Sequence, residues 1–163
     1  LANRRAFDEA LMQAWLSAPG RAAAAGLLVV DVDHFKAFND HFGHPAGDAC
    51  LRQVAQALLN ALRGDDLIAR IGGEEFAVLL CPTGPEALAA AAERLCRAVQ
   101  ALALPHDGEA GRSVVTVSVG AALGRHDVWD RPAALMEAAD QALYAAKRGG
   151  RNRWRVAGDA EPA

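Results

Sequence analysis

Apolar side chains recur at intervals of three and four residues in several segments of this chain of 163 residues. That spacing places them on one face of a helix. In one short segment the apolar face is formed by Phe35, Phe38 and Phe42, and the opposite face is polar. The helices predicted in this way cover residues 1–15, 35–42, 48–62, 84–102 and 132–147.

Short runs of aliphatic and β-branched residues separate these helices, and they are too short to be helices themselves. They predict strands at residues 26–31, 67–69, 76–80, 113–121 and 153–156. This order of strands and helices predicts an α/β fold in which helices pack on a mixed sheet. We expect one domain, residues 1–156, followed by a loose, disordered tail at residues 157–163.

Several residues mark the expected ends of the helices. Asp48 is predicted to be the N-cap of the third helix, and Gly64 to end it. Thr83 or Gly84 is expected to begin the fourth helix, with Leu102 as the last member of its buried stripe. Pro132 suits the first turn of the last helix.

The composition excludes several classes of protein. A net charge of −3 provides no basic field for nucleic acid or an anionic membrane. No apolar run approaches the roughly 20 residues that a membrane span needs. Cys50, Cys81 and Cys96 form no CxxC pair, which predicts buried, reduced thiols and a cytoplasmic location. His41 and His44 lack the cysteines of a common zinc site, so no metal is expected there.

Two adjacent acids, Glu74 and Glu75, follow a pair of glycines between two predicted strands. We expect Gly72 and Gly73 to adopt the positive φ angles of a tight hairpin turn. Asp31 ends an earlier buried strand, so pairing of the strands would gather three carboxylates, which hard cations such as Mg²⁺ prefer. The alternative is that acids at strand ends and turns only discourage aggregation of sheet edges.

An ordered series of motifs runs along almost the whole chain. It comprises Val30-Asp31-Val32-Asp33-His34-Phe35-Lys36, Asn39-Asp40, Phe42-Gly43-His44, Gly47-Asp48, Gly72-Gly73-Glu74-Glu75-Phe76, Thr116-Val117-Ser118-Val119-Gly120, Ala139-Asp140-Gln141-Ala142-Leu143-Tyr144-Ala145-Ala146-Lys147 and Gly150-Arg151-Asn152. Together they resemble the GGDEF domain of diguanylate cyclases, in its GGEEF variant. The resemblance implies a mostly antiparallel sheet, similar to class III nucleotide cyclases and polymerase palm domains. It also implies an enzyme that condenses two GTP into cyclic di-GMP and releases pyrophosphate.

The resemblance assigns metal binding and catalysis to the acidic residues. Asp31 and Glu75 look like metal ligands, with the carbonyl of Val32 contributing. Glu74 is similar to the acid that helps to hold the second metal and assists deprotonation of the 3′-hydroxyl group. Two Mg²⁺ or Mn²⁺ ions per site are implied, and the group that accepts the proton stays open.

The resemblance also assigns residues to the triphosphate. Lys36, Lys147 and Arg151 are similar to the family's triphosphate-binding residues, and Lys36 would also serve catalysis. Their charge would counter the charge on the transferring phosphoryl oxygens. For Lys147 and Arg151 the alternative is a basic helix end favoured by the macrodipole.

The same resemblance assigns guanine recognition to Asn39 and Asp48. A carboxylate can accept hydrogen bonds from the N1–H and amino groups of guanine, which adenine does not present at that edge. The alternative for Asp48 is an ordinary N-cap, and it could serve as both. Phe35 and Gly73 complete the expected substrate site.

Arg63-Gly64-Asp65-Asp66 matches the spacing of the family's RxxD product-inhibition site, with Arg94 as a second contributor. An arginine fork pairs well with phosphate, and its plane can stack on guanine. The alternative is a helix end followed by a polar turn.

Two GTP molecules must meet, so the resemblance implies a head-to-head homodimer that is at least transient. Residues that precede Asn3 in the family are missing here, and the chain is expected to be a catalytic fragment of a longer signalling protein. Two other functions stay open: a catalytically silent module that binds GTP or cyclic di-GMP, and a palm-type nucleotidyltransferase. The second would act on nucleic acid and would need a basic channel. A net charge of −3 offers no such channel, so contact with nucleic acid or a membrane is not expected.

Overall fold

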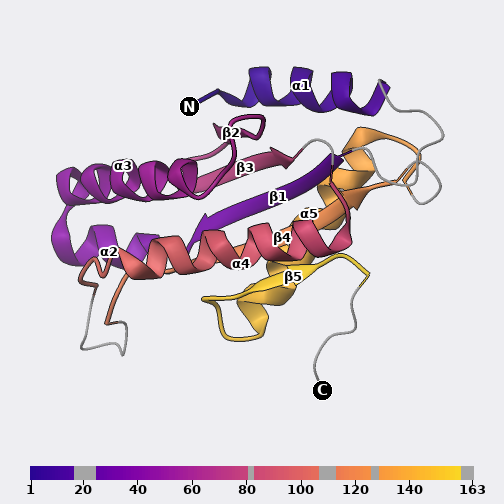
Figure 1. Ribbon diagram of the computed structural model, residues 1–163. Helices are drawn as coiled ribbons and strands as arrows, with labels where there is room; N and C mark the ends of the chain where they lie inside the picture. Colours follow the sequence, from indigo (N-terminus) through magenta and orange to yellow (C-terminus); the bar gives the residue numbers. More distant parts are fainter. Residues whose placement is uncertain (17–24, 81–82, 107–112, 126–128, 159–163) are drawn as a thin grey trace.

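The computed structural model describes residues 1–16, 25–80, 83–106, 113–125 and 129–158. Five helices and five strands are assigned within these ranges (Figure 1). In chain order they are α1 (Arg4–Leu16), β1 (Ala25–Val32), α2 (Phe35–Phe42), α3 (His44–Asn60), β2 (Leu67–Arg70), β3 (Glu75–Leu80), α4 (Pro85–Ala101), β4 (Val117–Gly124), α5 (Pro132–Arg148) and β5 (Trp154–Val156).

The strands form one sheet in the order β2-β3-β1-β4-β5. All neighbours are antiparallel except β4 and β5, which run parallel. This confirms the predicted mixed, mostly antiparallel sheet and places residues 154–156 on its edge. The central strand β1 is buried along its whole length, because it has neighbours on both sides and helices on both faces.

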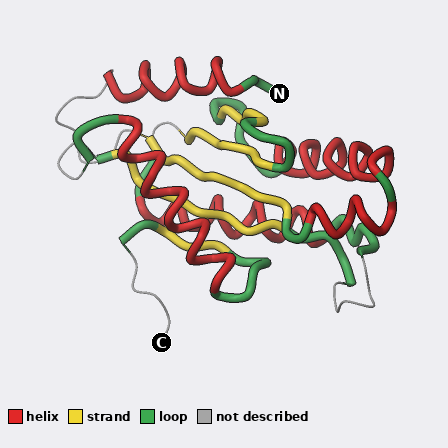
Figure 2. The backbone as a smooth tube through the Cα atoms, turned by 180° about the vertical axis from the view of Figure 1, so that it is seen from behind, coloured by secondary structure: helices red, strands yellow, loops and turns green. Residues whose placement is uncertain are grey.

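Helices cover both faces of the sheet. On one face α2, α3 and α4 pack with residues such as Leu28 and Val78, and on the other face α1 and α5 pack with residues such as Val29 and Ala77. The view from behind shows α5 crossing the second face (Figure 2). Gly120 of β4 permits this close approach, since a Cβ atom there would lie 2.1 Å from the carbonyl oxygen of Ala139.

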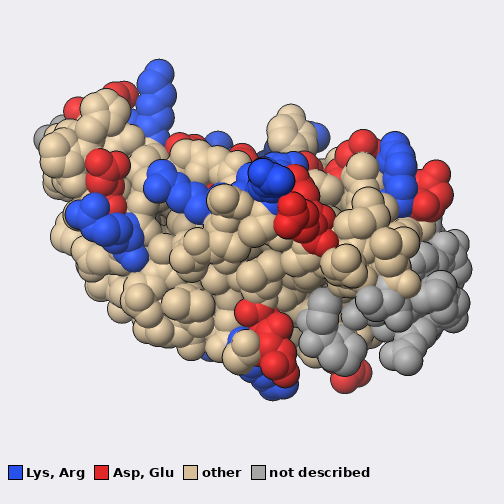
Figure 3. All heavy atoms as spheres, turned by 90° about the horizontal axis from the view of Figure 1, so that it is seen from above, with Lys and Arg blue, Asp and Glu red and all other residues tan. Residues whose placement is uncertain are grey.

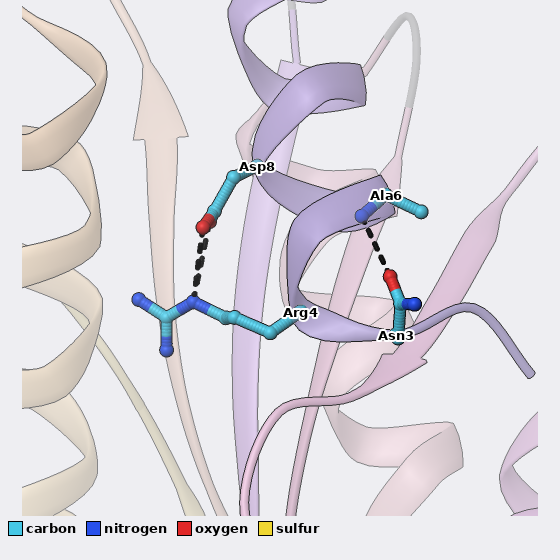
Figure 4. A network of polar contacts seen from close by, with 4 residues as sticks. All are labelled: Asn3, Arg4, Ala6 and Asp8. Atoms are coloured by element: carbon cyan, nitrogen blue, oxygen red, sulfur yellow. Dashed lines mark hydrogen bonds and ion pairs between the residues drawn. The ribbon is translucent and has the colours of Figure 1, made fainter.

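The N-terminal residues attach α1 to the outer edge of the sheet. Ala2 donates to the carbonyl of Ile68 and accepts from the backbone N–H of Arg70, at 3.2 and 3.1 Å. Asn3 then caps α1, because its side-chain oxygen accepts from the N–H of Ala6 at 2.8 Å (Figure 4).

Charges of both signs lie interspersed on the face seen from above (Figure 3). On α1, Arg4 pairs with Asp8 at 3.2 Å and Arg5 pairs with Glu9 at 3.3 Å. Within the part of the chain that the structure describes, no helix is long and apolar enough to cross a membrane.

Some predicted element ends are wrong. The third helix begins at His44, with Gly43 as its N-cap and a proline in its first turn, so Asp48 lies inside the helix and is not the N-cap. It ends at Asn60, before Gly64. The strand predicted from residue 113 begins at Val117, because residues 113–116 make only an isolated bridge.

Two apolar residues are less buried than their spacing suggests. Phe42 is 42% exposed at the end of α2, and its ring lies tilted against that of Phe38, with the ring centroids 4.8 Å apart. Leu102 is half-buried, because α4 ends at Ala101. By contrast, Gly84 is the N-cap of α4, and α5 begins at Pro132 as predicted.

Cys50 and Cys96 are buried free thiols, as predicted. Burial raises the pKa of the Cys50 thiol to about 11, and burial with the nearby charges of Glu93 and Asp33 raises that of Cys96 to about 12. Cys81 and residues 159–163 of the expected tail lie outside the described residues.

Candidate active site

The register of the sheet brings the predicted acids together. Asp31, at the end of β1, pairs directly with Glu75, at the start of β3. The backbone N–H of Val32 donates to the carbonyl of Glu74 at 3.2 Å, so the hairpin turn is fastened to β1 beyond the last strand pair. Antiparallel neighbours place such opposite residues about 5 Å apart, which is close enough for one ligand to meet both.

The hairpin turn does not rely on positive φ angles. Gly72 and Gly73 both lie outside the left-handed region, so that prediction is wrong. The turn is closed instead by Arg70, whose guanidinium group donates to the carbonyls of Gly72 at 3.2 Å and Gly73 at 2.6 Å. The carbonyl of Glu75 accepts from the N–H of Ile71 at 2.9 Å.

A basic side chain from the far end of the chain joins these acids. Lys147, in the last turn of α5, donates from Nζ to Oδ2 of Asp31. The Asp31 side chain is only 6% exposed, and that of Lys147 is 31% exposed. The second carboxylate oxygen of Asp31, Oδ1, is buried without a hydrogen-bond partner among the described residues.

Both glutamates carry raised pKa values. Burial is the main cause for each, followed by repulsion from Asp31, while Lys147 acts in the opposite direction. Asp140 on α5 raises the pKa of Glu75 further, and Arg4 on α1 lowers it. Negative charge is therefore more concentrated here than one lysine offsets.

This site fits a hard divalent cation on two observations. An unpartnered carboxylate oxygen of Asp31 is buried next to its strand partner Glu75, and the oxygen ligands gathered here are of the kind that such cations prefer. In the described ranges no three His, Cys, Asp or Glu side chains are already gathered into a metal-binding cluster.

The predicted guanine readers lie at the contact between α2 and α3. Asn39 and Gly47 touch so closely that a Cβ atom on Gly47 would lie 1.8 Å from Oδ1 of Asn39. That oxygen is buried and has no hydrogen-bond partner among the described residues. Asp48, next to Gly47, is exposed and lines a cavity of about 1060 Å³.

The same cavity reaches the hairpin turn. Its lining includes Asp48 and Arg52 on α3, and Arg70 and Gly72 at the turn. Asn39 and Phe35 do not line it; Phe35 is the first residue of α2 and is buried in the core. The cavity therefore joins one predicted guanine reader to the turn that carries the acids.

The other predicted phosphate ligands lie in the first turn of α2 and in the turn that follows α5. Lys36 is exposed in the first turn of α2. Arg151 follows α5 in a left-handed conformation, with φ 64°, and its N–H donates to the carbonyl of Ala146 at 3.1 Å. Gly73 is exposed at the tip of the hairpin.

The RxxD residues gather at a different place. Arg63, Asp66 and Arg94 line one cavity of about 290 Å³ between the end of α3 and α4. Asp66 accepts from the N–H of Arg63 at 2.9 Å, which fixes the turn, and Arg94 donates to the carbonyl of Ala61 at 3.3 Å.

The sequence interpretation missed two residues of the site, Arg70 and Asp33. Arg70 directly precedes the turn that it closes, but an exposed arginine at a strand end carries no distinctive pattern. Asp33 is 4% exposed. Its position two residues after Asp31, directly after the end of the buried strand, was a usable signal.

The fold and the site together define a class of protein, the α/β domains of the nucleotide cyclase and palm type. Its features here are a mostly antiparallel sheet, acids on adjacent strands and a lysine on the last helix. Residues 1–153 match the family model "Diguanylate cyclase, GGDEF domain". The chain belongs to this family.

Individual relatives agree with this assignment. The diguanylate cyclase DgcP of Pseudomonas aeruginosa is 42% identical over 157 residues, which are 96% of this chain and 23% of that protein. The chain thus spans about a quarter of the length of that relative.

Solved structures show the same fold. The GGDEF domain of DgcB from Caulobacter crescentus, in complex with c-di-GMP, is 38% identical with a TM-score of 0.87, and the match covers 98% of this chain and 92% of that one. The active GGEEF domain of a diguanylate cyclase from Vibrio cholerae is 30% identical with a TM-score of 0.83, covering 98% and 99%.

Proposed function

We propose that this domain is the catalytic unit of a diguanylate cyclase, which condenses two GTP into cyclic di-GMP with release of two pyrophosphates. The observation that carries the proposal is the convergence of Asp31, Glu75 and Lys147 from three distant parts of the chain. The acids that would bind a cation and the lysine that would bind phosphate therefore lie at the same end of the sheet.

In this proposal the acids hold two Mg²⁺ or Mn²⁺ ions through Asp31, Glu74, Glu75 and the Val32 carbonyl. The ions would supply activation of the 3′-hydroxyl group and neutralisation of the leaving pyrophosphate. Lys36, Lys147 and Arg151 bind the triphosphate. Lys147 would exchange its bond to Asp31 for a bond to phosphate, since both partners are anionic oxygens.

Selection of guanine rests on Asn39 and Asp48, which the α2–α3 contact keeps near each other. Asp48 accepts from the N1–H and amino groups of guanine. ATP lacks this pattern of donors, so it would form fewer hydrogen bonds with Asp48 and bind more weakly.

The reaction requires a second copy of the domain. Each copy holds one GTP, and each 3′-hydroxyl group attacks the α-phosphate held by the partner. We therefore propose a head-to-head homodimer that forms at least transiently, and a cytoplasmic location where GTP is available. The relative from Vibrio cholerae, described as active with the GGEEF motif, supports a functional role for Glu74.

Product inhibition at Arg63, Asp66 and Arg94 completes the proposal. Their cavity is separate from the acidic site and offers guanidinium groups to a phosphate. The structure of DgcB in complex with c-di-GMP supports binding of this product within the family. A catalytically silent binding module is the alternative, and the intact acidic set argues against it.

One experiment separates these functions. The protein is incubated with GTP and Mg²⁺, and the products are resolved by chromatography, with Glu75→Ala as the inactive variant. Cyclic di-GMP from the wild type and none from the variant is expected. Binding of GTP or cyclic di-GMP without turnover would favour the silent module, and activity that survives in Glu75→Ala would contradict the metal assignment.

A further inference from the structure

Asp33 is a buried carboxylate that lies beside the acidic site but points into the protein. It is 4% exposed, and three groups donate to it: the hydroxyl of Thr116 at 2.7 Å, the hydroxyl of Ser118 at 2.7 Å and the backbone N–H of Asn152 at 2.9 Å. Within the described ranges no lysine, arginine or histidine forms an ion pair with Asp33. These three hydrogen bonds hold the carboxylate in place.

The bond to Asn152 holds an unusual turn. After α5 the chain passes through three successive residues with positive φ: Gly150 at 122°, Arg151 at 64° and Asn152 at 45°. A left-handed conformation is unfavourable for a side chain such as arginine and persists only where the surroundings impose it. The bond from Asn152 to Asp33 and the bond from the N–H of Arg151 to Ala146 supply that constraint on both sides of Arg151.

Asp33 also stands at the start of the turn that leads into α2. Its own N–H donates to the carbonyl of Thr116 at 2.9 Å, and His34, which follows, is the left-handed N-cap of α2. Lys36 lies in the first turn of that helix. Asp33 thus joins the turn that precedes Lys36 to the turn that contains Arg151.

We propose that Asp33 is a positioning residue for triphosphate binding: its carboxylate fixes the Arg151 turn against the end of β1, so that Arg151 and Lys36 meet the same phosphate chain. The inference deepens the proposed function and rests on it for the identity of the substrate. Asp33 does not touch the nucleotide, and it acts through Arg151.

The test is the affinity for GTP and for guanosine, measured by calorimetry. Asp33→Ala removes all three acceptor contacts, and we expect roughly a tenfold loss of GTP affinity, the effect of a displaced arginine–phosphate contact. Guanosine carries no phosphate, so its affinity is expected to be unchanged. Equal losses for both ligands would show a general structural role and overturn the proposal.

A double-mutant cycle tests the route through Arg151. Once Arg151→Ala has removed the phosphate contact, adding Asp33→Ala is expected to cost less than about twofold more in GTP affinity. Additive losses would overturn the inference. Asp130→Asn, at an exposed acid far along the sequence, is the control and should leave both affinities unchanged.

The conservative variant Asp33→Asn guards against a folding defect in Asp33→Ala. Its amide oxygen can still accept from Asn152, while the hydroxyl of Ser118 can turn to accept from the amide nitrogen. We expect GTP affinity between those of the wild type and Asp33→Ala, again without a change for guanosine. An Asp33→Asn variant that folds but loses guanosine affinity in parallel would contradict the proposal, whereas a wild type that binds no GTP would overturn the proposed function itself.

Discussion

Lys147 donates a hydrogen bond to the carboxylate of Asp31, linking residues that are 116 positions apart in the sequence. One partner ends the central strand and the other lies in the last turn of α5. The lysine therefore occupies one oxygen of the carboxylate that is expected to bind a cation. Lys147 and a metal ion bound at the free Oδ1 would compete for the negative charge of one carboxylate, unless a phosphate draws the lysine away.

The first prediction follows from this competition. Without nucleotide, Lys147→Gln is expected to bind Mn²⁺ about two- to fivefold more tightly than the wild type, the effect of removing a partly exposed ion pair. The same variant should bind GTP more weakly. Both constants can be measured by calorimetry.

Lys36→Gln is the matched control for that measurement. Lys36 is exposed and forms no ion pair with Asp31, so Mn²⁺ binding without nucleotide should not change. An unchanged or weaker Mn²⁺ affinity in Lys147→Gln would contradict the competition.

The second prediction concerns the pH dependence of stability. Burial and Asp31 raise the pKa of Glu75 above its ordinary value of about 4.3. The folded state then binds more protons than the unfolded state between the ordinary and the raised value, so stability falls as pH rises through that window. Above the window the ionised side chain destabilises the fold in the absence of metal.

Glu75→Gln is therefore expected to raise the thermal unfolding midpoint at about pH 7.5 in the presence of a chelator. The difference should shrink below about pH 3.5, where Glu75 is mostly protonated in both states. Adding Mg²⁺ should stabilise the wild type more than the variant. A variant that is less stable than the wild type at neutral pH would show that the carboxylate has a favourable partner that compensates for its burial.

Much of the fold could be predicted from periodicity alone, and so could part of the site. Asp31 and Glu75 meet because Asp31 follows one apolar run, Glu75 precedes another, and the two runs pair as antiparallel neighbours in the sheet. The start of α3 could not be read in this way. Pro45 and Gly47 resemble loop residues, yet proline fits the first turn of a helix and Gly47 is required where Asn39 presses against α3.

The local sequence pattern also could not predict how the hairpin turn is closed. A glycine pair suggested positive φ angles, whereas the turn is held by the side chain of Arg70. The contacts of Lys147 and Asp33 join segments more than 80 residues apart, as their separations of 116, 83, 85 and 119 show. Such contacts depend on how α5 and its following turn pack against the sheet, which no short window of sequence specifies.

The third prediction tests the close contact between Asn39 and Gly47. Gly47→Ala places a Cβ atom 1.8 Å from the Asn39 oxygen and 3.2 Å from the ring of Phe35, so the Asn39 side chain must turn away. Loss of one reader is expected to weaken GTP binding roughly tenfold. Asn39→Ala should have the same effect, and the double variant should lose no more than either single one.

The helix itself should tolerate the change, because alanine is favoured over glycine inside a helix by about 1 kcal/mol. Thermal unfolding of Gly47→Ala therefore serves as the check on folding. GTP affinity equal to that of the wild type would show that Asn39 does not read the base.

The last prediction separates the RxxD cavity from the active site. Arg63 and Arg94 line this cavity, and Asp66 holds the turn through the N–H of Arg63. Arg63→Ala keeps that backbone bond while removing the guanidinium group. We expect calorimetry to show at least a tenfold loss of cyclic di-GMP affinity, with GTP affinity unchanged.

Arg97→Ala is the matched control for the cavity, since Arg97 lies on α4 one turn beyond Arg94 and pairs with Glu93 at 2.6 Å instead of lining the cavity. It should bind cyclic di-GMP as the wild type does. In turnover assays Arg63→Ala should keep its initial rate and lose its sensitivity to added product. If cyclic di-GMP binds Arg63→Ala as tightly as the wild type, the product binds elsewhere, and a joint loss of GTP and product affinity would place it in the acidic site.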